Sequence, residues 1–212
     1  LDALREVMPL NEKRGKLLDD RVYNYVDEFS EEFIANSPML FIAAANASCH
    51  VDVTAKGDMP GFVKLLDDKK TLLFPERAGN NDARIFRNII ENNQVALVFI
   101  IPKVGEVLRV TGRAVITREP ELLEQLVSCE KSAVICLKIT VDECFFNCKR
   151  AFNRSHIWKP EKWTAKVKPY MAEQASLRSI QEKDSAKHLT VERYNELTEA
   201  IISKLGERDG AY

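Results

Sequence analysis

The sequence lacks the short motifs that mark the commonest nucleotide-binding and hydrolytic enzymes. It contains no Gly-x-Gly-x-x-Gly, no Walker loop, no Gly-x-Ser-x-Gly elbow and no His-Glu-x-x-His. The three histidines, His50, His156 and His188, are scattered, and no two of the five cysteines form a Cys-x-x-Cys pair, so we expect no metal site. A chain without an evident nucleophile or metal cage is compatible with chemistry borrowed from a bound cofactor.

The sequence also lacks net charge and long apolar runs. Lys and Arg total 31 against 32 Asp and Glu, a formal net charge of -1. That balance argues against general binding to nucleic acids or anionic membranes, so any anion site must be local. No stretch approaches the roughly 20 apolar residues needed to span a bilayer. We therefore expect a soluble cytoplasmic protein with reduced, buried thiols, although Cys144 and Cys148 could share a helix face.

The chain reads as three segments, residues 1–36, 37–150 and 151–212. The first is predicted to be helical because Val22, Val26, Phe29 and Phe33 recur at three- and four-residue steps. Proline disfavours helical backbone in the residue before it, so this helix should stop at Asn36-Ser37-Pro38. The last segment should end in an amphipathic helix with Thr190 as its N-cap.

The middle segment has the periodicity of strands. Residues 39–45 and 95–101 are apolar runs typical of buried strands, whereas residues 50–56 and 107–116 alternate. Residues 67–70 predict a hairpin, and residues 133–141 predict a last strand. Because helices are missing between most strands, a parallel sheet is excluded. The pattern predicts a mainly β fold with flanking helices: a six-stranded antiparallel sheet closed into a small barrel.

A phosphate site is suggested where the strand ending at Pro75 gives way to a helix over residues 83–93. A helix N-terminus favours anions, Gly79 permits close backbone approach, and Asn80 can donate an amide. Arg84 in the first turn opposes the helix dipole unless an anion lies there. The alternative is that Arg84 pairs with Asp82 or Glu76, as surface ion pairs commonly do.

Two further segments could extend this site. Asp52, Thr54 and Lys56 share one face of a strand, and Lys56 with Arg77 and Arg84 would supply three positive charges to one phosphate. The alternative is that Lys56 protects an exposed sheet edge. Residues 152–158 interleave basic and aromatic side chains that could stack on a planar ring, or could form a structural turn in which Trp158 fills the core.

Several ordered motifs make the chain resemble a known family. They are Asp52-Val53-Thr54-Ala55-Lys56-Gly57-Asp58, Phe74-Pro75-Glu76-Arg77-Ala78-Gly79-Asn80, Asn88-Ile89-Ile90-Glu91-Asn92, Leu108-Arg109-Val110-Thr111-Gly112-Arg113-Ala114 and Cys144-Phe145-Phe146-Asn147-Cys148-Lys149-Arg150-Ala151-Phe152. Over roughly residues 20 to 160, the series resembles the pyridoxamine 5'-phosphate oxidase-like flavoproteins, in particular a bacterial subgroup described as FMN-dependent enzymes.

This resemblance implies an FMN-binding split β-barrel that forms a homodimer, with each FMN in a groove between two subunits. Residues in three places would contact FMN: Val53, Thr54 and Lys56 along the flavin; Arg77, Gly79, Asn80 and Arg84 at the phosphate; and Arg154 and Trp158 reaching the partner's flavin. Ala83 and Ile85 stand where the oxidases proper have the serine and lysine of a Ser-Arg-Lys motif, so the oxidase substrate is not carried over.

The resulting hypothesis is an FMN-dependent oxidoreductase acting on an unidentified small molecule. Two alternatives stay open at this stage. One is a flavin-binding redox sensor or carrier without turnover, and the other is the same barrel holding a deazaflavin or haem in place of FMN.

Overall fold

The computed structural model describes residues 2–77, 82–128, 132–163, 170–181 and 190–209. The chain divides into two compact units, residues 1–160 and 161–212. The first contains α1 (Asp2–Val7), α2 (Glu12–Asp19), α3 (Glu28–Asn36), β1 (Met39–Ala45), β2 (Val51–Gly57), β3 (Lys64–Leu65), β4 (Thr71–Glu76), α4 (Arg84–Glu91), β5 (Gln94–Ile100), β6 (Val107–Thr117), α5 (Pro120–Glu124), β7 (Ile135–Asn147) and α6 (Arg150–Ser155). A short 3-10 helix, η1 (Pro160–Lys162), follows, and α7 (Tyr170–Gln181) and α8 (Val191–Asp209) belong to the second unit. The three segments predicted from the sequence stay a prediction.

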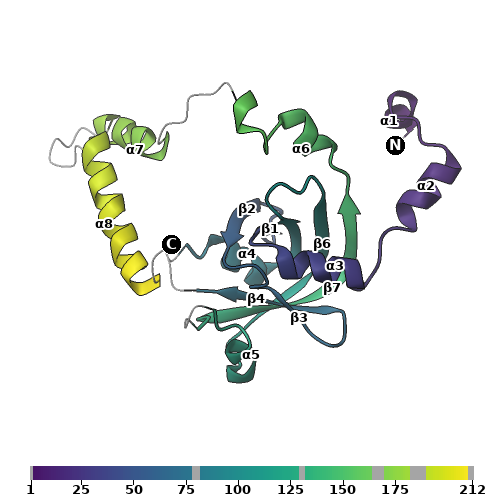
Figure 1. The fold of residues 1–212 in the computed structure, drawn as a ribbon, viewed down its shortest axis with the longest axis horizontal. Coiled ribbons are helices and arrows are strands. Elements are labelled where there is room, and N and C mark those ends of the chain that lie inside the picture. The colour runs from purple at the N-terminus through teal and green to yellow at the C-terminus, as the bar shows by residue number, and fades with distance from the viewer. Residues whose placement is uncertain (1, 78–81, 129–131, 164–169, 182–189, 210–212) are drawn as a thin grey trace. The chain divides into compact units, whose positions relative to one another are not determined.

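The strands form one antiparallel sheet in the order β2-β1-β5-β6-β7-β4-β3. Figure 1 shows the sheet curling into a partial barrel, with α3 lying across it. The predicted split-barrel class is confirmed, with seven strands in place of six because the hairpin arm Lys64–Leu65 pairs with β4. The hydrogen-bonded order begins at β2 and ends at β3, so the described ladder does not close on itself.

The longest pairing, between β6 and β7, carries a bulge at Thr111/Gly112. A Cβ on Gly112 would overlap the carbonyl oxygen of Thr140, so only glycine allows the two backbones to approach this closely. β7 extends to Asn147, well beyond the predicted end of its strand at residue 141. The suggestion that Cys144 and Cys148 share a helix face is therefore wrong, because Cys144 is buried on β7 and Cys148 follows the strand and is exposed.

The interior of the barrel is filled by alternate side chains of the long strands. The fully enclosed members include Leu40, Ile42, Leu72, Phe74, Leu97, Phe99, Leu108, Val110, Leu137 and Ile139. Helix α4 closes part of this core with Ile85, Phe86 and Ile89. The same helix also buries a polar residue and exposes an apolar one: Asn88 is buried and donates a hydrogen bond to the Ala44 carbonyl oxygen (3.2 Å), whereas Ile90 is 76% exposed.

The first segment is only partly helical as predicted. Residues 20–27 are not in a helix, because Tyr23 exchanges backbone hydrogen bonds with Cys144 of β7 (3.1 and 2.7 Å). Pairing with the sheet competes successfully with helix formation here, and the predicted helical positions Val22 and Val26 fall in this stretch. α3 begins after Asp27, whose side chain accepts a hydrogen bond from the Ser30 N–H, and ends at Asn36 as expected.

The second unit is a helical hairpin in which α7 packs on α8. Ala172 is fully buried. Thr190 is confirmed as the cap of α8, since its hydroxyl accepts a hydrogen bond from the Arg193 N–H (3.2 Å). Among the helices that the structure describes, none combines the length and apolarity needed to cross a membrane.

Candidate functional site

Two ion pairs join the far ends of the open sheet. Lys56, near the end of β2, places its Nζ 2.6 Å from Oε2 of Glu76 at the end of β4. One residue beyond each strand, Asp58 and Arg77 form a second pair at 2.6 Å. In this pair the negative charge follows β2 and the positive charge follows β4. All four side chains are only about a fifth exposed, at 20–21%. Side chains therefore bridge β2 and β4, which are not neighbours in the strand order.

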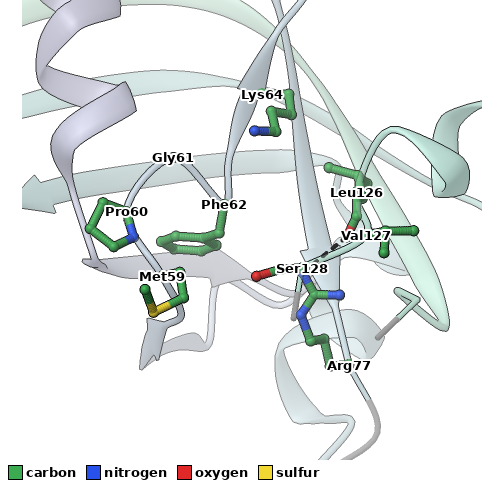
Figure 2. Close-up of a pocket in the computed structure, with 9 residues that line it drawn as sticks. All are labelled: Met59, Pro60, Gly61, Phe62, Lys64, Arg77, Leu126, Val127 and Ser128. Carbon is green, nitrogen blue, oxygen red and sulfur yellow. Dashed lines mark hydrogen bonds between the residues drawn. The ribbon is translucent and has the colours of Figure 1, made fainter. Parts of the chain in front are cut away.

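Arg77 is held on the side of the barrel that carries α5. Its Nε donates to Asp58 Oδ2 and its Nη2 donates to the Leu126 carbonyl oxygen (2.9 Å). A small pocket of about 80 Å³ lies on this side, and Arg77, Ser128 and Lys64 are among the residues that line it. Figure 2 shows these lining residues. The predicted contact of Arg77 with a phosphate stays a prediction, and in this structure the guanidinium ties the end of β4 to the loop after α5.

The carboxylate of Asp58 accepts three side-chain or backbone hydrogen bonds, from Arg77 Nε, Met59 N (2.7 Å) and Ser128 Oγ (3.4 Å). Burial raises the pKa of Asp58. The hydrogen bonds and the positive charge of Arg77 outweigh burial, so the pKa lies below its ordinary value of 3.8. Asp58 therefore stays ionised at neutral pH and keeps Arg77 in place.

Lys56 contacts both its ion-pair partner on β4 and the start of α4. Besides its bond to Glu76, its ammonium lies 5.5 Å from the centre of the Phe86 ring, close enough for a cation–π interaction. Its positive charge also helps to lower the pKa of Asp82. Lys56 therefore lies near the N-terminal end of α4, and its predicted role beside Arg84 at a phosphate stays a prediction.

Arg84 opens α4 and is bound to a carboxylate from its own chain. The N-cap residue, Ala83, supplies no side-chain hydrogen bond. Instead, Asp82 Oδ1 accepts from the Arg84 backbone N–H (3.1 Å), and both Asp82 oxygens accept from Arg84 Nε (2.9 and 3.1 Å). The Arg84 side chain is 74% exposed. Of the two alternatives drawn from the sequence, the structure shows the pair with Asp82.

Asp82 and Arg84 at the start of α4 each stabilise the charged form of the other. The side-chain hydrogen bond from Arg84, followed by its backbone N–H, lowers the pKa of Asp82 to about 2. Asp82 in turn raises the pKa of Arg84, with a smaller contribution from Asp52. The Asp82 carboxylate therefore lies where the sequence predicted a bound anion beside Arg84.

The two faces of β2 have opposite environments. Asp52, Thr54 and Lys56 are half-buried, and the charge of Asp52 reaches Arg84. Val51 and Val53 are 65% and 60% exposed on the outer face. Thr54 therefore lies on the same face of β2 as Lys56, whereas Val53 lies on the opposite face. Gly79 and Asn80 lie outside the described residues.

Arg154 and Trp158 make no hydrogen bond or ring contact with Lys56 or Arg84. The Trp158 Nε1 donates to the Val104 carbonyl oxygen (2.9 Å), and its ring stacks on Phe152 with centroids 5.7 Å apart. The chain turns after α6, as in the structural-turn alternative, but Trp158 is only half-buried and does not fill the core. Arg154 is exposed on α6. Their predicted contact with a partner's flavin stays a prediction.

Reasoning from the sequence missed two of the three carboxylate pairs. It considered a pair of Arg84 with Asp82 or Glu76, but it did not predict the pairs of Lys56 with Glu76 and of Arg77 with Asp58. The only available signal was the alternation of sign within Lys56-Gly57-Asp58 and Glu76-Arg77. Within the described part of the chain, no three His, Cys, Asp or Glu side chains gather where they could hold a metal ion.

The family model for pyridoxamine 5'-phosphate oxidase matches residues 26–148, more than half of the chain. The chain belongs to the pyridoxamine 5'-phosphate oxidase family. The matched region runs from Val26, just before α3, to the residue after β7 and includes every strand of the barrel. This confirms the family resemblance inferred from the ordered motifs.

Solved structures with a similar barrel include HupZ from Group A Streptococcus, which is 20% identical, with 57% of this chain and 93% of that chain covered and a TM-score of 0.46. General stress protein 26 from Bacillus anthracis is 10% identical, with 54% and 88% covered and a TM-score of 0.43. HutZ, a haem storage protein from Vibrio cholerae, is 14% identical, with 58% of this chain and 94% of that chain covered and a TM-score of 0.40. Among curated protein sequences, nothing matches the chain. Membership of the pyridoxamine 5'-phosphate oxidase family therefore rests on the family model.

Proposed function

We propose that this member of the family is an FMN-binding flavoprotein, and that it acts as an oxidoreductase on a small molecule. The observation that carries the proposal is the bound carboxylate at the start of α4. Arg84 holds Asp82 with its backbone N–H and its guanidinium, the same donors that bind a phosphate oxygen pair. The donor set therefore fits the phosphate of FMN.

The residues around Arg84 suit the rest of such a site. Lys56 adds a second positive charge at the start of α4, and Phe86 provides an apolar wall beside it. Thr54 shares the inner face of β2 with Lys56. When bound, FMN would supply the electron-transfer chemistry, while Arg84 and Lys56 would hold its phosphate and Thr54 would orient the ring.

We also propose that two copies of the chain form the complete site. The outer face of β2 and β1 carries Val51, Val53 and Phe41, which are 65%, 60% and 37% exposed. The register places Ala55 beside Phe41, and Phe41 beside Val98 of β5, so these apolar side chains form continuous rows. A contiguous exposed apolar surface of this kind favours burial against another protein surface.

The cofactor is tested by the visible spectrum of the purified protein and the mass of what it releases on denaturation. Free FMN in the supernatant supports the proposal. A deazaflavin or haem would replace FMN as the cofactor, and a colourless protein that binds no added FMN would contradict flavin binding altogether. Reduction of the bound flavin by a nicotinamide cofactor, with reoxidation by an acceptor, would favour an enzyme over a sensor or carrier.

The phosphate contact is tested by Arg84→Ala. We expect FMN to bind about tenfold more weakly or worse, because charge-assisted hydrogen bonds to the phosphate are lost. Riboflavin, which has no phosphate, should bind as before. Arg113→Ala is the matched control, since Arg113 is also exposed and paired with an aspartate, Asp142, at 3.1 Å. Equal FMN affinity in wild type and Arg84→Ala would place the phosphate elsewhere.

The dimer is tested by Val53→Glu and light scattering. A carboxylate in a buried apolar interface is costly, so we expect this variant to be monomeric and the wild type dimeric. Val115→Glu is the control, because Val115 is similarly exposed, at 59%, but lies on β6 outside the rows of β2, β1 and β5. A monomeric wild type, or two variants that dissociate equally, would count against this interface.

A further inference from the structure

Each cation of the candidate phosphate cluster has a carboxylate partner in the same chain, but the three pairs differ in exposure. The pairs Lys56–Glu76 and Asp58–Arg77 are about a fifth exposed, at 20–21%. In the third pair, Arg84 is 74% exposed and Asp82 is 36% exposed. A ligand arriving from solvent therefore meets the third pair first.

The two half-buried pairs are poor candidates for exchange. They connect the end of β2 to the end of β4, and breaking them would leave charges unpaired in a region with little water. An exposed pair differs, because water solvates both partners after separation and the net stabilisation is small. Arg84 can therefore leave Asp82 at little cost, whereas Lys56 and Arg77 cannot leave their partners as easily.

Asp82 and a phosphate would compete for the same donors. The Asp82 carboxylate accepts from the Arg84 N–H and Nε. A phosphate monoester carries about -1.5 to -2 charges at neutral pH, against -1 for a carboxylate. Phosphate should thus win the guanidinium, but it must displace Asp82 and then lie beside the displaced charge.

We propose that Asp82 is a specificity-determining residue: its carboxylate holds Arg84 in the free protein, weakens flavin binding through the phosphate, and leaves binding through the ring unchanged. This inference rests on the proposed FMN site. It predicts that the natural protein prefers FMN over riboflavin by a smaller factor than the same protein would without the negative charge of Asp82.

The experiment compares FMN and riboflavin binding to wild type and Asp82→Asn by fluorescence titration of the full chain. Asparagine keeps a carbonyl oxygen for the Arg84 N–H and removes the charge. We expect FMN to bind about three- to tenfold more tightly to the variant, consistent with the loss of one exposed ion pair and one repulsion. Riboflavin affinity should change by less than about twofold, because riboflavin has no phosphate for the charge of Asp82 to repel.

The matched control is Asp142→Asn, which removes one carboxylate from another exposed ion pair, with Arg113 (3.1 Å), and leaves the cluster intact. It should change neither affinity. Asp82→Ser, a second neutral acceptor, repeats the test if the asparagine variant folds poorly. Unchanged or weaker FMN binding in the Asp82 variants, or equal changes for FMN and riboflavin, would overturn the role of Asp82. A wild type that binds neither flavin would overturn the proposed site itself, so the two failures are distinguishable.

Discussion

The half-buried pair between Asp58 and Arg77 makes a measurable prediction about stability. Asp58→Asn removes the charge that faces Arg77 Nε at 2.6 Å and keeps an acceptor for the Met59 N–H. An exposed ion pair contributes about 0–1 kcal/mol, and breaking a fully buried pair costs about 3–5 kcal/mol. Both side chains here are 20% exposed, so we expect a loss of about 2 kcal/mol in the free energy of unfolding.

The pH dependence separates this charge effect from a packing defect. The pKa of Asp58 in the folded chain lies below its ordinary value of 3.8. A lowered carboxyl pKa stabilises the folded state above the unfolded-state pKa, and that stabilisation is lost as the pH falls through the folded-state pKa. The difference between wild type and Asp58→Asn should therefore be constant from about pH 5 to 8 and shrink below about pH 4.

The assay is urea unfolding followed by circular dichroism at about pH 7 and about pH 3. At neutral pH, a loss of about 2 kcal/mol corresponds to a melting temperature lower by about 4–8 °C for a domain of this size. Asp142→Asn serves as the control, because its exposed pair with Arg113 should have an effect within about 0.5 kcal/mol. No difference at pH 7, or a difference undiminished at pH 3, would refute the role of the ion pair.

Two further predictions concern the barrel itself. Gly112→Ala should lower the free energy of unfolding by about 1–3 kcal/mol or more, because the new methyl group would overlap the Thr140 carbonyl oxygen; chemical denaturation measures this, and a neutral substitution would contradict the tight bulge. Burial raises the pKa of the Cys144 thiol to about 11, so in native protein near pH 8 iodoacetamide should label exposed Cys49 and leave Cys144 unmodified until unfolding. Peptide mapping by mass spectrometry checks this, and comparable native labelling of both thiols would argue against the buried position on β7.

Local patterns predicted much of the secondary structure. Alternation over residues 50–56 and 107–116 corresponds to β2 and β6, and the turn over residues 67–70 joins β3 to β4. The end of α3 at Asn36 follows from Pro38 two residues later. The helical prediction failed over residues 20–27, because a partner 121 positions away in the chain, Cys144 for Tyr23, supplies backbone hydrogen bonds that no local pattern reveals.

In the candidate site, too, the sequence indicated the local contact and not the contacts between distant residues. The pairing of Arg84 with Asp82, two residues away, was one of two alternatives that the sequence left open, because neighbours along the chain are forced close together. The partners of Lys56 and Arg77 were not predicted, since each ion pair spans about 20 positions and depends on how the sheet curls.

The sequence by itself determined the alternating faces of the strands and the antiparallel class of the fold, and it left open whether Lys56 lies near Arg84. Only the tertiary structure decided which face of β2 turns inward, because alternation defines two faces but not the one that packs. It also decided that every cation of the cluster meets a carboxylate. Charges interact through space, and their distances are set by the curled sheet and not by their spacing in the chain.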